Sequence, residues 1–249
     1  MSAPTRLSLD QSGVRSWPAL RTEQLGPWVR RVGEGFTRRA NSVAVLESVH
    51  GEGLVELVAT AEEGYTSDGL PPRFQIPVLD ENAELDALVQ ARGYEWVDHS
   101  LVMTMDLSSV PEGPDGVDID SAPDDAWFET WWAVDGRPDE QRPAAHRLVD
   151  RMVASPDVNA GFISTPDRVS VGMGVVDGPL LAMASLATRP VARGQGHASA
   201  VIATILAWGR ASGAEHGWFQ VRVDNDRARS LYDHLGFVGS HEYRYAERL

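Results

Sequence analysis

Apolar residues in the second half of the chain recur in short runs, and each run stops at residues that end a helix or turn a strand. Helical spacing runs through "DAWFETWWAVDG" up to Gly136 and through "PDEQRPAAHRLVDRMVAS" up to Ser155 and Pro156. The run "AGFIST" predicts a short strand. Two further strands flank Asp177 and Gly178, a dipeptide typical of a tight hairpin. The pattern therefore predicts two helices followed by three strands.

The same alternation continues to the end of the chain. The run "VIATILAWGRASG" has helical spacing and ends at Gly213, and "WFQVRV" predicts a strand after it. A further helix over "DNDRARSLYDHLG" can be capped by Asn225 or Asp224 and is ended by Gly236. The run "HEYRYAE" predicts a last strand.

Residues 73–97 repeat the pattern of residues 218–240. In each segment a strand ("RFQIPV" or "WFQVRV") leads into a capped helix and a Gly-aromatic exit ("GY" or "GF"). The match predicts an internal duplication, with two halves of the same topology. Only the second half has a glycine-rich loop before its central helix, because the first half reads "ESVHGEG" there. We therefore expect the first half to keep the scaffold and to have lost the site.

A segment rich in Pro, Gly and Asp, "SSVPEGPDGVDIDSAPDD", separates the two halves. Such a composition is typical of a linker. It predicts domains at 1–110 and 118–249, joined by a linker at 111–117.

Composition excludes several kinds of chemistry. The formal net charge of −14 argues against a nucleic acid or an anionic membrane as partner. The chain has no cysteine and no lysine, which excludes thiolate, Schiff-base and P-loop lysine chemistry. The beginning "MSAPTRLSLD" has no apolar leader pattern, and no apolar run is long enough to span a bilayer. We expect a cytoplasmic protein without a metal site.

The loop "VARGQGHASA" favours a phosphate ligand. Gly194 and Gly196 let the backbone turn its N–H groups inward, and a helix starting near His197 adds the partial positive charge of its N-terminus. A dinucleotide motif would need a third glycine where Ser199 stands, and a P-loop would need a lysine. The pyrophosphate of coenzyme A fits better than either.

Two motifs in the second half resemble those of GCN5-related N-acetyltransferases (GNAT). The donor motif Q/R-x-x-G-x-G/A is matched by Arg193, Gly196 and Ala198, and the later motif N-x-x-A-x-x-L-Y-x-x-x-G-F is matched from Asn225 onward. The resemblance covers about residues 117–249. The first half resembles the degenerate first domain of tandem acetyltransferases found in actinobacteria. The implied fold is α/β (α+β), with two GNAT-like domains, each a mixed, mainly antiparallel sheet flanked by helices.

The resemblance also implies the site. Tyr232 corresponds to the general acid that protonates the leaving thiolate. The residues implied to bind acetyl-CoA, used as a cosubstrate, are Leu186, Ala187, Thr188, Arg193, Gly194, Gln195, Gly196, His197, Ala198, Ser199 and Asn225. A general base is not evident, because neither "AMASLAT" nor "WFQVRV" contains a carboxylate.

The acceptor pocket of this family is built largely by the first two helices. Here that region carries Trp131, Trp132 and Asp135, which would attract a cationic amine. An acidic helix that packs through its tryptophans is an equal alternative.

We therefore expect an N-acetyltransferase that moves the acetyl group of acetyl-CoA to a primary amine by direct attack. Two alternatives remain: a non-enzymatic CoA-binding sensor or partner-binding protein with a vestigial site, and an acyltransferase for a thiol-bearing metabolite. The residue pattern leaves the acceptor and the oligomeric state open.

Overall fold

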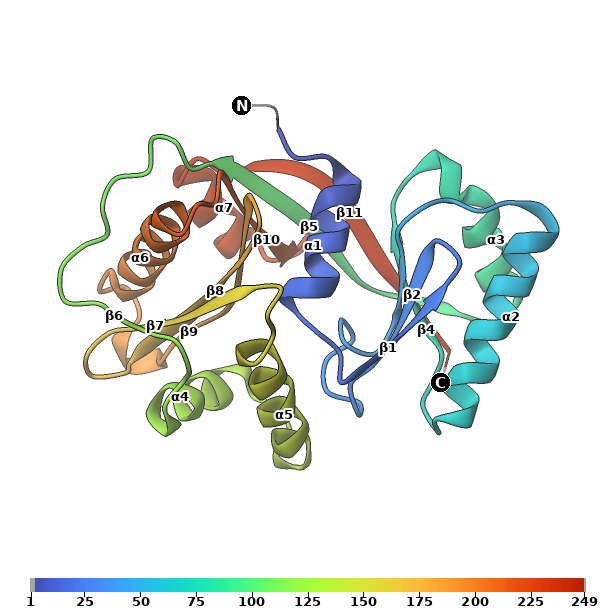
Figure 1. Cartoon of the computed structure of the whole chain (residues 1–249), viewed down its shortest axis with the longest axis horizontal. Helices are drawn as coiled ribbons and strands as arrows, with labels where there is room; N and C mark the ends of the chain where they lie inside the picture. Colours follow the sequence, from blue (N-terminus) through green and yellow to red (C-terminus); the bar gives the residue numbers. More distant parts are fainter. Residues whose placement is uncertain (1–2, 249) are drawn as a thin grey trace. The chain divides into compact units, whose positions relative to one another are not determined.

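The structure is a computed structural model that describes residues 3–248 (Figure 1). The described chain forms two compact units. We call residues 104–219, together with residues 3–5, the middle unit, and residues 6–103 with 220–248 the N/C unit.

The middle unit is a mixed sheet flanked by helices. Its strands pair in the order β6-β7-β8-β9-β10, antiparallel except for the parallel pair β9–β10. These strands are β6 (Asp118–Asp120), β7 (Asn159–Ser164), β8 (Ser170–Asp177), β9 (Leu180–Thr188) and β10 (His216–Arg222), whose last three residues belong to the N/C unit. The helices are α4 (Asp125–Asp135), α5 (Arg142–Val153) and α6 (His197–Ala211).

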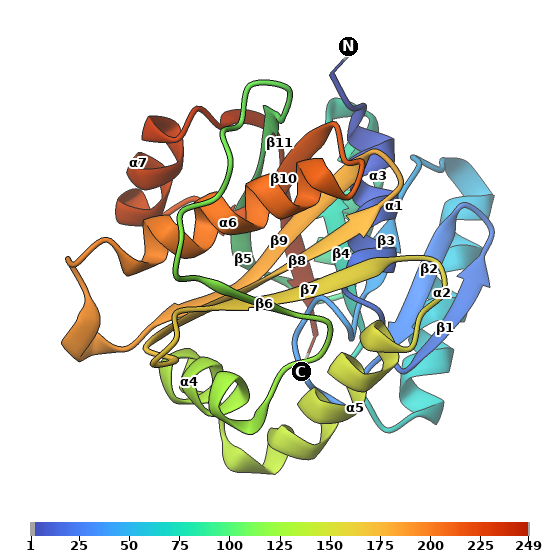
Figure 2. The ribbon, with the colours of Figure 1, turned by 60° about the vertical axis from the view of Figure 1, so that its left-hand side comes forward.

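Helices cover both faces of this sheet (Figure 2). On one face α6 lies close to the strands, because a Cβ at Gly172 would come within 3.0 Å of Val201 on that helix. On the other face Trp127 of α4 packs edge-to-face against Phe162, with the ring centroids 5.2 Å apart. The lack of a side chain at Gly172 therefore lets α6 lie close to β8.

The N/C unit repeats this arrangement. Its sheet has the order β1-β2-β3-β4-β11, antiparallel except for the parallel pair β3–β4. These strands are β1 (Arg21–Leu25), β2 (Trp28–Val32), β3 (Val43–Val45), β4 (Arg73–Pro77) and β11 (Val238–Glu247). The helices are α1 (Arg6–Ser16), α2 (Gly51–Ser67), α3 (Ala83–Ala91) and α7 (Asp226–His234), and most of the long strand β5 (Glu95–Asp106) also belongs here.

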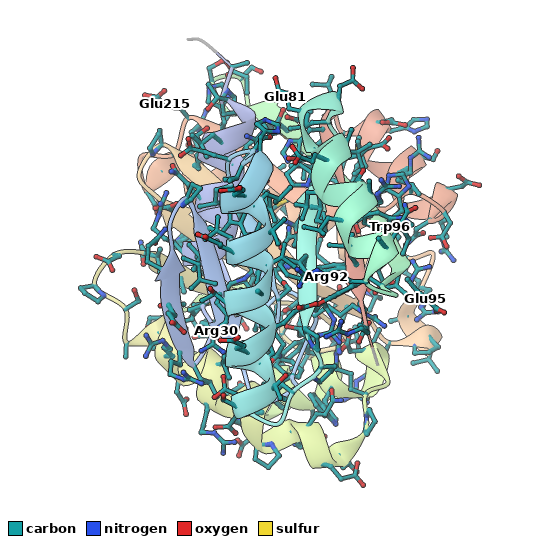
Figure 3. All side chains as sticks on the ribbon, turned by 90° about the vertical axis from the view of Figure 1, so that its right-hand side faces the viewer. Arg30, Glu81, Arg92, Glu95, Trp96 and Glu215 are labelled. Carbon is teal, nitrogen blue, oxygen red and sulfur yellow. The ribbon has the colours of Figure 1, made fainter. Side chains whose placement is uncertain are left out.

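Figure 1 shows α1 on one side of this sheet and α2 and α3 on the other. The apolar core lies under α2 and α3 and includes Trp28, Leu54, Phe74 and Leu85. Figure 3 views that side, where Arg92 at the end of α3 forms an ion pair with Glu62 of α2 at 2.5 Å. The two helices are thus tied to each other as well as to the sheet.

The C-terminal strand β11 belongs with the N-terminal half of the chain. It pairs antiparallel with β4, and Glu247 lies opposite Arg73. The buried carboxylate of Glu247 forms ion pairs with Arg73 and with Arg38, whose Nε lies 3.0 Å away. The compact units therefore do not follow the chain order, and the domain boundaries at 1–110 and 118–249 stay a prediction.

The expected elements of the second half are confirmed. Gly136 ends α4 in the left-handed conformation (φ +69°). The hairpin between β8 and β9 also forms, but its turn consists of Gly178 and Pro179, because Asp177 still pairs with Leu180 as the last residue of β8. Asn225 caps α7. The mixed, mainly antiparallel sheets flanked by helices also confirm the fold class. Within residues 3–248, none of the helices combines the length and apolar character that crossing a bilayer requires.

Replacing Glu247 by Gln should destabilise the N/C unit by about 2–3 kcal/mol at pH 7, because buried Arg73 loses its charged partner. Burial acts to raise the pKa of Glu247, but hydrogen bonds from Arg73 and Arg38 outweigh it, so the pKa lies below its ordinary value. Such a carboxylate contributes stability that is present above its unfolded pKa of about 4.3 and is lost as the pH falls through the folded value.

The difference in unfolding free energy between the wild type and Glu247→Gln should therefore shrink below about pH 4. Urea unfolding from pH 7 to pH 3 measures it, with the exposed Glu81→Gln as a control that should change little (Figure 3). A difference that stays constant over this range would contradict the role given to the charge of Glu247.

Candidate functional site

The glycine-rich loop between β9 and α6 takes a backbone shape that favours glycine at two positions. Gly194 has φ +77° and Gly196 has φ +85°, both in the left-handed region. A Cβ built at either position would meet no atom within 4 Å. The space beside both glycines is therefore open, so backbone conformation rather than packing accounts for glycine there.

The loop presents a run of backbone N–H groups without acceptors. The first hydrogen bond of α6 runs from the Ala200 N–H to the Gly196 carbonyl at 3.0 Å, and no side chain caps the helix. No acceptor for the six N–H groups from Gly194 to Ser199 is found among the described residues. Backbone donors are almost always paired with protein or water, so this run can receive an anion. We call these six residues the amide cradle.

Two side chains hold the loop at its edges. Arg193 Nε donates to the carbonyl of Thr188 at 3.2 Å, and Gln195 Nε2 donates to the carbonyl of Val191 at 3.1 Å. Both side chains are exposed. The remaining N–H groups of Arg193 add positive charge beside the amide cradle.

Strand β9 is irregular where it approaches the loop. Its register with β8 shifts between Val171 and Met173, and Ser185 has φ +53° and a buried Oγ without a hydrogen-bond partner. Pairing between β9 and β10 is limited to Leu180–Ala182. The predicted contact residues Leu186, Ala187 and Thr188 lie beyond that pairing. Within the middle unit, no strand pairs with these three residues on the side of β9 that faces β10.

The predicted acceptor residues on α4 behave differently from one another. Trp131 and Trp132 are 4% and 5% exposed, and the Trp132 indole donates to Asp139 at 2.9 Å. Asp135 is exposed and forms an ion pair with Arg137. The burial of the tryptophans favours the alternative in which they pack the helix. Their role toward an acceptor stays a prediction.

Asn225 and Tyr232 belong to the N/C unit. Asn225 Oδ1 accepts a hydrogen bond from the Ala228 N–H at 3.1 Å and so caps α7. Tyr232 is 8% exposed and packs edge-to-face on Phe237 with the centroids 5.7 Å apart. Burial raises the pKa of the Tyr232 phenol to about 12. The phenol is therefore protonated at neutral pH.

Two features of this region have no signal in the sequence. The bulge at Ser185 forms at a non-glycine residue with positive φ. Arg189 Nε donates to Thr130 Oγ1 at 2.9 Å, and that hydroxyl donates to the carbonyl of Arg168 at 2.6 Å. This chain of hydrogen bonds fixes the start of the loop to α4. Across residues 3–248, no cluster of three His, Asp or Glu side chains is arranged to hold a metal ion.

Comparison with known proteins places this chain in a family. The family model described as "Probable histone acetyltransferase Rv0428c C-terminal" matches residues 6–246. The uncharacterised N-acetyltransferase YobR of Bacillus subtilis (strain 168) is 28% identical over 246 residues, which cover 95% of this chain and 96% of YobR.

Solved structures share the fold at lower identity. A GCN5-related N-acetyltransferase from Kribbella flavida superposes with a TM-score of 0.67 and 16% identity, covering 98% of this chain and 96% of that one. A tandem GNAT protein from the clavulanic acid biosynthesis pathway gives a TM-score of 0.65 and 13% identity, covering 100% of this chain and 89% of that one. Together with the named relative, they favour the enzymatic interpretation over the non-enzymatic one. The chain thus belongs to the Rv0428c C-terminal acetyltransferase family and is an acyltransferase of the GCN5-related N-acetyltransferase type.

Proposed function

We propose that the chain transfers the acetyl group of acetyl-CoA to a primary amine, with the CoA pyrophosphate bound in the amide cradle. The observation that carries the proposal is the run of six N–H groups without acceptors from Gly194 to Ser199. A pyrophosphate supplies several anionic oxygens, and the N-terminus of α6 favours negative charge. The open space beside Gly194 and Gly196 lets the phosphates approach the backbone.

The pantetheine arm is then expected to run along β9. The edge at Leu186, Ala187 and Thr188 lies beyond the pairing with β10, so an extended amide chain can add to it as a further strand would. This direction leads from the amide cradle toward the bulge at Ser185. The thioester would therefore lie near the irregular part of β9.

The reaction needs a neutral amine, a polarised carbonyl and a proton for the sulfur. The amine nitrogen attacks the thioester carbon, the C–S bond breaks to release the CoA thiolate, and the amine loses a proton while the thiolate gains one. We assign Tyr232 as the proton donor to the sulfur, because its buried phenol remains protonated at working pH. Asn225 would contact the pantetheine arm through its amide N–H₂, since its Oδ1 caps α7.

A cationic acceptor suits the charge of the chain, which is −14. The exposed acids at the C-terminal end of α4 and just after it include Asp135, Asp139 and Glu140. A basic peptide and a small diamine are therefore the first acceptors to test, against a neutral amine of similar size. Equal turnover of cationic and neutral amines would contradict this preference.

Gly196→Trp should abolish binding of acetyl-CoA, because a large side chain enters the space beside the amide cradle. Gly178→Trp is the matched control: Gly178 also has a positive φ (+56°) and nothing within 4 Å of its Cβ, but it lies in the β8–β9 turn. Calorimetric titration of the wild type and both variants measures binding, and thermal unfolding checks that each variant folds.

We expect one equivalent of acetyl-CoA to bind the wild type and Gly178→Trp, and at least about a 100-fold loss for Gly196→Trp, since several charge-assisted hydrogen bonds are lost. Two equivalents would show that the first half also binds the donor. Unchanged affinity in Gly196→Trp, or no binding to the wild type, would overturn the assignment of the amide cradle.

Tyr232→Phe should lower kcat by about 10²- to 10⁴-fold, as is typical for loss of a general acid, while leaving the affinity for acetyl-CoA nearly unchanged. With the pKa of Tyr232 raised to about 12, kcat/KM should show no fall due to this phenol below about pH 11. Rates of CoA release from pH 6 to pH 10 measure this. A normal rate in Tyr232→Phe would exclude the role.

A further inference from the structure

The N/C unit buries a positive charge without a negative partner. Arg31 on β2 is 1% exposed. Its Nε donates to the carbonyl of Ser42 at 3.0 Å, and its Nη2 donates to Ser42 Oγ and Gln75 Oε1, both at 2.7 Å. All of these acceptors are neutral. Among residues 3–248, no carboxylate forms an ion pair with Arg31, and both N–H groups of its Nη1 lack an acceptor.

The side-chain pattern of the sheet explains why Arg31 lies inside. Successive residues of a strand point to opposite faces. Val43 and Val45 on β3 belong to the apolar core under α2, so Ala44 points to the opposite face. Ala44 is paired with Gln75 on β4 and with Val29 on β2, and Arg31, two residues after Val29, lies on the same face. That second face is covered by α1 and carries small and polar residues. An arginine buried there lowers stability unless something offsets its desolvation.

A pocket lies between α1 and this polar face. Its cavity volume is about 10 Å³, room for about one water-sized group, and the pocket is partly open to solvent. Its lining includes the side chains of Asp10, Arg31, Arg39, Gln75 and Gln220. The guanidinium carbon of Arg39 lies 5.2 Å from the ring centroid of Trp17, which is the contact that positions it.

The one carboxylate in the lining is already paired. Asp10 Oδ2 lies 2.6 Å from Arg6 Nη1, and Asp10 Oδ1 lies 3.0 Å from His241 Nε2. Asp10 is therefore committed to Arg6 and His241 and leaves Arg31 and Arg39 uncompensated. Burial lowers the pKa of Arg31, and the nearby charge of Arg39 acts in the same direction.

The two glutamines that line the pocket also have N–H donors that are not used in hydrogen bonds. Gln75 Oε1 accepts from Arg31, and Gln220 Oε1 accepts from the Tyr243 hydroxyl at 3.0 Å. The amide N–H₂ of each has no acceptor within the described part of the chain. The pocket thus gathers N–H donors from two arginines and two glutamines around one space.

We propose that this pocket binds the carboxylate of a small organic acid, whose oxygens accept hydrogen bonds from Arg31 and Arg39. A planar carboxylate matches the fork of a guanidinium. Its single charge suits a lining that still contains Asp10, whereas the second charge of a phosphate would be repelled. Because the cavity has room for about one water-sized group, only the carboxylate oxygens would enter it, and the rest of the acid would lie at the open mouth of the pocket. This site is separate from the amide cradle and does not depend on acetyl-CoA.

The test is a titration of the full chain at constant ionic strength with acetate, butyrate and benzoate, and with chloride and inorganic phosphate as the other anions. Thermal unfolding and calorimetry are the readouts. Arg39→Gln is the main variant, because Arg39 is only half-buried and the variant should fold. Arg31→Lys keeps the positive charge but removes the planar guanidinium, which can donate two parallel hydrogen bonds to a carboxylate. Arg15→Gln is the matched control, an exposed arginine on α1.

We expect at least one of the three carboxylates to bind at one equivalent and to raise the Tm by about 5 °C near saturation, with chloride ineffective. Arg39→Gln and Arg31→Lys should each weaken that binding by about tenfold or more, since a charge-assisted hydrogen bond is lost. Arg15→Gln should bind as the wild type does. The proposal is overturned if no carboxylate acts beyond chloride, if phosphate binds in their place, or if Arg39→Gln and Arg15→Gln bind equally well.

Discussion

Backbone N–H groups at the start of a helix must find acceptors, and in α6 residues 3–248 supply none to the first turn. Everything proposed about the donor follows from this constraint. Gly194 and Gly196, with positive φ, extend the row of unpaired donors backward from the helix into the loop. Arg193 holds the loop to the end of β9 through the carbonyl of Thr188. We therefore propose that the loop holds an anion in the open space beside its glycines.

The N/C unit follows the same principle with side chains instead of backbone. Its sheet has an apolar face under α2 and α3 and a polar face under α1. Buried polar groups are normally paired, so donors left without acceptors around one space point to a ligand. In the middle unit these donors are amides, and in the N/C unit they are guanidinium and glutamine groups. In our proposals, each compact unit thus holds a site of its own, and the two sites differ in the groups that bind the ligand.

Much of the fold could be predicted from the sequence, because local rules fix it. The stop at Gly136 and the Asn225 cap follow from the conformations that these residues favour, and the structure confirms them. The hairpin between β8 and β9 is confirmed as well, with its turn one residue later than predicted, at Gly178 and Pro179. What sequence could not predict depends on contacts between distant segments. The pairing of β11 with β4 and the buried ion pair of Glu247 with Arg73 join residues far apart in the chain. The bulge at Ser185 has no glycine to signal it. In the sequence, Arg31 looks like an ordinary surface arginine. Only the alternation of side chains along the paired strands shows that it lies on the buried polar face of the sheet.

The measurement that tests the central claim most directly is the backbone amide spectrum of the protein during titration with acetyl-CoA. The account predicts that the largest shifts fall on Gly194 to Ser199, since these amides gain hydrogen bonds to phosphate, with further shifts at Leu186 to Thr188. Dephosphorylated pantetheine, which lacks the pyrophosphate, should then shift the β9 residues but not the amide cradle. Shifts that leave Gly194 to Ser199 unchanged while acetyl-CoA binds would contradict the account, because the donor would then be held elsewhere.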